Sequence, residues 1–185
     1  MKKKLSFIGL SLFALILAAC GNDSNDNGDA TNKAPAFDDV YENVENAVKE
    51  ILLEDSDMSE DEMFESYILE DLTATDADES EVAVMLERME IEQSQLANGK
   101  VIGALMNINA DEIFVLEAKS EEDVADLKAS LERELEAQIQ TWEQYLPDQY
   151  EKVKKNVIET NGNFLLYATF SDTDKVADAF KAAFE

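Results

Sequence analysis

The first regular pattern along the chain is a repeat of apolar residues at spacings of three and four between residues 36 and 53. One face of an α-helix presents positions at this spacing, so the segment predicts an amphipathic helix. Ser59 with Glu62, followed by apolar residues through Ile68, is a capping-box pattern and predicts a second, shorter helix. Residues 79–92 favour neither a helix nor a strand.

Two short apolar runs, at residues 101–106 and 113–118, flank the turn-forming sequence NINADE. Apolar runs of this length around a turn predict two strands of a sheet. The second run is apolar on both pleat faces as far as Leu116, which is typical of a central strand covered on both sides. A further strand is expected at residues 164–170.

The longest apolar stripe extends from Val124 to Leu146 at helical spacing, after a start signal at Ser120. Pro147 ends this helix and can open the next one, which the spacing extends through Ile158 to the Asn161-Gly162 pair. Ser171 with Asp174 predicts the start of a last helix.

The order of these elements predicts the fold class. A helix, strands, two helices, a strand and a helix indicate an α+β domain, with a small, mainly antiparallel sheet packed by amphipathic helices. Residues 37–185 are sufficient for one such domain, which would bury about two-thirds of its unfolded surface. The sequence therefore predicts a single domain over this range.

The segment before the domain has the composition of a secretory signal. Three lysines at positions 2 to 4 precede a largely apolar stretch over residues 5–17. At about 1.5 Å per residue, this stretch covers roughly 20 Å as a helix, whereas the hydrocarbon core of a bilayer is roughly 30 Å thick. Residues 1–19 are therefore expected to be a signal peptide that is removed, and not a permanent membrane span.

The signal ends in the sequence LAAC, formed by Leu17, Ala18, Ala19 and Cys20. This ending resembles the lipobox of bacterial lipoproteins. The resemblance implies that the Cys20 thiol receives a diacylglyceryl group and that the chain is cut just before it. Residues 20–36, with the polar sequence GNDSNDNGDATNKAPA after the cysteine, then form a flexible linker between the lipid and the domain. We expect a lipid-anchored protein at the extracytoplasmic face of the cell membrane.

Composition excludes several classes of function. The chain has 42 acidic and 15 basic residues, for a net charge of −27, so binding to nucleic acid is not expected. It has no histidine, and Cys20 is its only cysteine. Zinc sites, cysteine–histidine pairs and histidine-containing triads are therefore not available. No cofactor is expected.

Candidate chemistry is confined to acids and aromatic residues. Asp76, Asp78, Ser80 and Glu87 fit four positions of a calcium loop, although Glu81 stands where such a loop needs glycine. A solvated acidic face is the simpler interpretation of these residues. The aromatic residues Trp142, Tyr145 and Tyr150 could stack on a sugar ring, but their helical spacing is also typical of a core.

Two stretches of the domain carry a family resemblance: MNINADEIFVLEAKS at residues 106–120 and LEAQIQTWEQYLPDQYEKVKKNVIETNGNFLLYATF at residues 135–170. They resemble a family of Gram-positive lipoproteins known only as a domain of unknown function. The resemblance covers about residues 37–184 and implies an anchored extracytoplasmic domain, without assigning an activity.

These observations lead to a functional hypothesis. We expect an interaction or accessory module that binds a membrane-proximal or cell-wall macromolecule and is not an enzyme, because no catalytic spacing is present. A lipoprotein that binds a cation or a small ligand is the alternative. An enzyme acting on cell-wall glycan comes third, because no spacing selects two of the many carboxylates as a catalytic pair.

Overall fold

The computed structural model describes residues 34–54, 59, 65–74 and 81–185. Ala34–Glu185 form one compact unit. The lipobox residues Leu17, Ala18, Ala19 and Cys20 lie outside the described residues, as do the predicted signal peptide and most of the linker.

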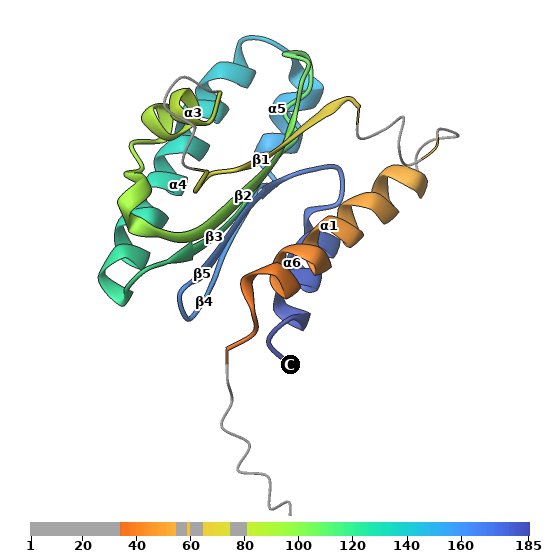
Figure 1. The fold of residues 1–185 in the computed structure, drawn as a ribbon. Coiled ribbons are helices and arrows are strands. Elements are labelled where there is room, and N and C mark those ends of the chain that lie inside the picture. The colour runs from red at the N-terminus through yellow and green to blue at the C-terminus, as the bar shows by residue number, and fades with distance from the viewer. Residues whose placement is uncertain (1–33, 55–58, 60–64, 75–80) are drawn as a thin grey trace, which may run out of the picture. The chain divides into compact units, whose positions relative to one another are not determined.

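The centre of the domain is a five-stranded antiparallel sheet in the order β1-β2-β3-β5-β4 (Figure 1). Its strands are β1 (Tyr67–Asp71), β2 (Leu96–Ala104), β3 (Glu112–Ala118), β4 (Val157–Asn161) and β5 (Phe164–Thr169). The described ranges also contain the helices α1 (Phe37–Glu54), α3 (Glu81–Met89), α4 (Glu121–Glu143), α5 (Pro147–Val153) and α6 (Thr173–Ala182). The predicted α+β class with a mainly antiparallel sheet is confirmed.

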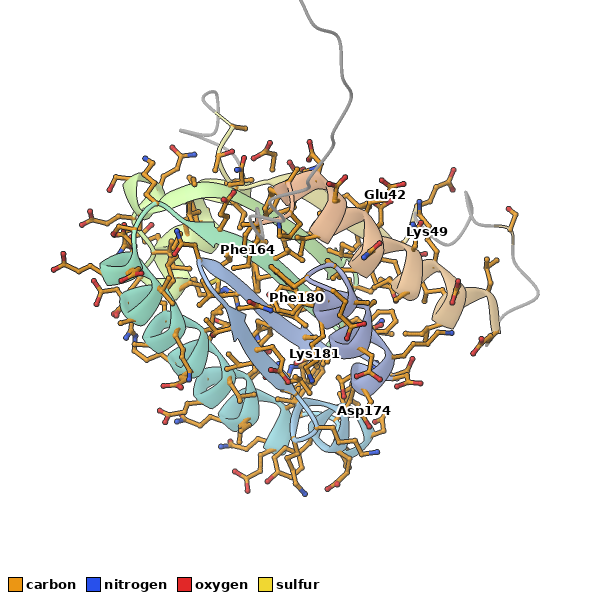
Figure 2. The ribbon with its side chains drawn as sticks, turned by 90° about the horizontal axis from the view of Figure 1, so that it is seen from below. Glu42, Lys49, Phe164, Asp174, Phe180 and Lys181 are labelled. Carbon is orange, nitrogen blue, oxygen red and sulfur yellow. The ribbon has the colours of Figure 1, made fainter. Side chains whose placement is uncertain are left out.

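Helices cover both faces of the sheet, which gives the domain three layers (Figure 1). On one face, α1 and α6 pack against inward residues such as Val115 and Leu166. Phe164 and Phe180 lie in this layer, whereas Asp174 and Lys181 lie on the outside of the domain (Figure 2). On the other face, α3 and α4 cover a second set of buried side chains.

The central strand β3 explains the continuous apolar run in the sequence. Ile113 and Val115 face the layer of α1 and α6, whereas Phe114 and Leu116 face the layer of α3 and α4. All four side chains are at most 1% exposed. The prediction of a central strand covered on both sides is confirmed, because β2 and β5 flank β3.

The ends of two predicted helices are strands, whereas most of the first of these helices, at residues 60–64, lies outside the described residues. Tyr67 and Ile68 belong to β1, where they pair with Ala104 and Gly103 of β2. In the other segment, helix α5 ends at Val153, and Val157 and Ile158 belong to β4. Val157 packs against the layer of α1 and α6, and Ile158 packs against the layer of α3 and α4, so these neighbours point to opposite faces. That alternation is a property of a strand and not of a helix.

Helix starts follow the sequence signals closely. The Ser120 hydroxyl accepts a hydrogen bond from the Asp123 amide at 3.3 Å and caps α4, and Pro147 opens α5. The cap of α6 differs from the prediction. Asp172, and not Ser171, accepts a hydrogen bond from the amide of Lys175 at 3.0 Å.

None of the helices in the described part of the chain is both long and apolar enough to cross a bilayer.

Candidate functional site

A partly buried ion-pair cluster joins three elements on the α4 side of the sheet. It consists of Arg88 from the last turn of α3, Glu112 from the start of β3 and Glu134 from the middle of α4, and we call it the arginine cluster. Arg88 donates from one terminal nitrogen to Glu112 Oε1 at 2.7 Å and from the other to Glu134 Oε1. One guanidinium therefore bridges two carboxylates, a geometry that its planar fork of donors suits.

The local sequence explains why these charges are buried. Glu112 precedes Phe114 and Leu116 at strand spacing, so it shares their face of β3. Glu134 follows Leu131 and Leu127 at helical spacing, so it lies on the buried stripe of α4. The Glu134 side chain is 1% exposed and that of Glu112 is 15% exposed, whereas the Arg88 side chain is 39% exposed. The cluster therefore opens to solvent on its arginine side.

A chain of hydrogen bonds extends the cluster along α4. Gln138 donates to Glu134 Oε1 at 2.6 Å, and its own carbonyl oxygen accepts from the indole nitrogen of Trp142 at 2.8 Å. Each step advances one helical turn. The buried indole donor of Trp142 is thus satisfied through Gln138, and the carboxylate of Glu134 binds two donors at once.

Burial sets the electrostatics of the cluster. It raises the pKa of the Glu112 carboxyl group to about 7. The positive charge of Arg88 opposes this rise, and the negative charge of Glu134 adds to it. Burial and the negative charge of Glu112 hold the pKa of the Tyr167 hydroxyl well above its usual range. Glu112 Oε2 and the Tyr167 hydroxyl are buried and have no hydrogen-bond partner within the described part of the chain.

Next to the cluster is a groove of about 280 Å³, lined by Arg88, Glu90, Arg133, Glu134, Ala137, Gln138 and Thr141. We call it the arginine groove, because Arg88 and Arg133 are the only arginines in the whole sequence. Arg133 donates to the Ser130 hydroxyl at 2.9 Å, and its Nε lies 3.1 Å from Glu90 Oε2. The 13 lysines of the chain supply the rest of its positive charge.

Glu90 forms the rim of the groove from an unusual backbone position. Its φ of +55° lies in the left-handed region, which glycine usually occupies when it ends a helix. The Ile91 amide donates to the Leu86 carbonyl at 3.0 Å, the bond expected at such a helix end. Glu90 is therefore a strained residue at the end of α3, and its carboxylate lies beside Arg133.

The three aromatic candidates have different surroundings. Trp142 is 6% exposed and packs with Val153 and Ala110. Tyr150 is half-buried, with Lys154 Nζ 5.0 Å from its ring centroid. Tyr145 is 51% exposed, and its ring lies 5.7 Å from that of Trp142 at an angle of 37°. Of the three, only Tyr145 presents a largely open ring.

The metal candidates lie mostly outside the described residues. This is true of Asp76, Asp78 and Ser80, whereas Glu87 is exposed on α3. Within residues 34–54, 59, 65–74 and 81–185, no three histidine, cysteine, aspartate or glutamate side chains are placed to hold a metal ion.

Sequence reasoning did not find the arginine cluster, although two signals of it are present. One is the restriction of arginine to positions 88 and 133 in a chain with 57 charged residues, the sum of 42 acidic and 15 basic ones. The other is Glu134, an acid that falls on the apolar stripe of a predicted helix. A charge at such a position indicates a buried partner.

The domain is thus a three-layer α+β domain with a partly buried arginine–carboxylate cluster beside an open groove. The sequence model of the family described as "Domain of unknown function (DUF4358)" matches residues 69–170, and the chain belongs to this family. The matched range contains the arginine cluster and the arginine groove. No curated protein and no solved structure matches the chain.

Proposed function

We propose that this chain is a lipoprotein of the kind found in Gram-positive bacteria, held at the extracytoplasmic face of the cell membrane by a diacylglyceryl group on Cys20. The observation that carries the proposal is the sequence LAAC at Leu17–Cys20, where a short apolar stretch meets a polar linker. A lone cysteine is enough for this role, because two acyl chains on one residue hold stably at a membrane whereas one does not.

We further propose that the domain acts as an interaction or accessory module and not as an enzyme. The absence of histidine from the sequence and the assignment of its one thiol to lipid support this role. Anchoring raises the local concentration of a membrane or cell-wall partner, so weak binding is sufficient there.

Replacement of the lipid-bearing residue tests the anchoring. Cys20→Ala is expected to abolish incorporation of a labelled fatty acid and to prevent the cut before residue 20, because no other thiol is present. Metabolic labelling followed by electrophoresis measures both effects. Ser24→Ala, four residues further along the linker, is the matched control and should label as the wild type does. Full labelling of the Cys20→Ala protein would refute the lipid anchor.

The arginine groove favours a second candidate function, the binding of a small ligand that carries a carboxylate or phosphate group. Both arginines of the chain line this groove. Arginine binds such oxyanions with two parallel hydrogen bonds. The Arg133 side chain is 49% exposed, and its partner Glu90 is 73% exposed, so an anion can replace this ion pair at little cost.

Titration with inorganic phosphate and with acetate tests this second candidate. The wild-type protein should show saturable chemical-shift changes around the groove with at least one probe, and Arg133→Gln should weaken that binding about tenfold. Lys128→Gln, which removes the same charge from an exposed position of α4, should bind as the wild type does. Equal weakening by both substitutions would indicate a general effect of charge and would exclude a site in the groove.

A further inference from the structure

The turn between β2 and β3 exposes an unusual concentration of apolar side chains. Leu105, Met106 and Ile108 are 54%, 58% and 51% exposed. They are three of the seven large apolar side chains that are exposed in the described part of the chain, and they lie within four positions of one turn. Single exposed apolar residues are ordinary on a protein surface, but a group of them usually marks a binding surface.

The polar base of this turn holds it in place. The Asp111 carboxylate accepts hydrogen bonds from the Tyr67 hydroxyl at 2.7 Å, from Asn109 Nδ2 at 2.9 Å and from Lys152 Nζ at 2.5 Å. Lys152 also donates to Asn109 Oδ1 at 2.9 Å. Asp111 is 7% exposed, so these are buried, charge-assisted bonds.

Backbone contacts attach the turn on two further sides. The Ala110 amide donates to Gln149 Oε1 of α5 at 3.0 Å, and the Leu105 amide donates to the carbonyl oxygen of Ser66, just before β1, at 3.0 Å. The turn is therefore fixed to β1 and to α5 while its apolar tip points to solvent. A preformed tip loses little conformational entropy when it binds, which favours recognition.

A further exposed aromatic side chain lies on the connection between α4 and α5. Tyr145 is 51% exposed there, and this connection and the β2–β3 turn lie at the same end of the domain (Figure 1). Ala110 and Trp142 belong to one apolar cluster, which links the two segments beneath the surface. We call Leu105, Met106, Ile108 and Tyr145 the docking face.

Acidic residues border the docking face. Glu65 is exposed beside Ser66, which binds the Leu105 amide. On the other side, Asp148 accepts from Gln149, the residue that binds the Ala110 amide. The nearby Lys152 side chain is only 19% exposed and is bound to Asp111. The rim is therefore negative, like the chain as a whole with its net charge of −27.

We propose that the docking face binds a protein partner whose apolar cleft is bordered by lysine or arginine side chains. The charge of the rim selects this occupant, because opposite charges around an apolar contact attract and orient the partner. A second copy of the chain would bring the same acids to the contact, and anionic lipid would be repelled. This inference rests on the interaction role proposed above and names its surface.

The position of the docking face agrees with the proposed anchoring. Helix α1 begins at Phe37, at the end of the domain opposite to the β2–β3 turn (Figure 1). Residues that lead into α1 therefore enter the domain away from the docking face.

Site-specific photo-cross-linking in intact cells tests the proposal, with the anchored full-length chain carrying a photoreactive residue at position 106. The matched control carries it at Val84, which is 68% exposed on α3. Mass spectrometry should identify one recurring protein that is captured from position 106 and not from position 84. That protein is then purified, and its affinity for the domain is measured.

Binding of the purified partner gives the decisive result. Met106→Asp should weaken it about tenfold or more, Val84→Asp should leave it unchanged, and added salt should weaken it because the rim contacts are ionic. Capture of a partner only from position 84 would refute the docking face but not the interaction role. Equal affinity of the partner for the Met106→Asp and wild-type proteins would have the same meaning. Capture of lipid or of a second copy from position 106 would also overturn the docking face. No adduct from either position would refute the interaction role as well.

Discussion

Replacing Arg88 by alanine is expected to lower the free energy of unfolding by about 2 to 4 kcal/mol at pH 8. The change leaves Glu112 and Glu134 facing the same buried site without the guanidinium that bridges them. Removing one partner of a buried ion pair costs about 3 to 5 kcal/mol when the pair is fully enclosed. We expect the lower range because the Arg88 side chain is 39% exposed and water can replace part of it. Urea unfolding measured by circular dichroism gives the value.

The pH dependence of the destabilisation by Arg88→Ala distinguishes a loss of charge from a simple loss of packing. Without Arg88, the pKa of the Glu112 carboxyl group rises further in the folded state, because the cation that favoured its charged form is absent. Glu112 then protonates more readily as the pH falls, and the penalty of Arg88→Ala at pH 5 should be smaller than at pH 8. An equal penalty at both pH values would show that the charge of Arg88 contributes little.

Lys128→Ala is the matched control for Arg88→Ala. Lys128 lies on α4, is 50% exposed and pairs with Glu132 at 4.0 Å, so its loss should cost less than about 0.5 kcal/mol. A destabilisation of 2 kcal/mol or more in this control would mean that general charge balance, and not the arginine cluster, determines the result.

Much of the fold could be predicted because its apolar periodicity is local. The stripes of α1 and α4 and the two-sided run of β3 each fall within one stretch of sequence, and each became the expected element. The start of α4 was also predictable, since Ser120 and Asp123 form its cap within four residues. Information of this kind needs no knowledge of the rest of the chain.

The two strands that stand where the ends of predicted helices were expected depend on distant partners. β1 is an edge strand, and its five residues are half-buried or exposed, without the alternation of buried and exposed positions that marks a strand in the sequence. It is identified as a strand by its pairing with β2. β4 follows α5 in the sequence and pairs with β5 through the tight turn at Gly162, where φ is +56°. This pairing replaces the expected continuation of the helix beyond Val153. Tertiary pairing overrides local preference at such positions.

The candidate site was largely hidden for the same reason. Arg88 is separated from Glu112 by 24 positions and from Glu134 by 46, and no short motif spans them. Each acid is one of 42 in the sequence, so acidity alone could not select it. The sheet and α4 bring the three residues together, and only then does their burial distinguish them from solvated charges.

Glu112→Gln should make the domain more stable above pH 7 and remove part of its pH dependence. Burial raises the folded-state pKa of Glu112 to about 7, whereas an exposed glutamate has a pKa near 4.3. Between these values the folded state keeps a proton that the unfolded state releases, so the wild-type protein loses stability as the pH rises from about 4.3 to about 7. Glutamine cannot titrate, yet its carbonyl oxygen can still accept a hydrogen bond from Arg88.

The difference in unfolding free energy between Glu112→Gln and the wild-type protein should therefore grow across this pH range and become constant above it. Its total change should be about 3 to 4 kcal/mol, in favour of the glutamine variant at high pH. Chemical unfolding at closely spaced pH values measures the difference directly and cancels the titration of the other acids. Glu132→Gln, at a carboxylate that is 58% exposed on α4, is the control and should follow the wild-type curve. If the Glu112→Gln difference were flat with pH, or grew as the pH fell, Glu112 would be charged throughout the range, and Arg88 would outweigh the effect of burial.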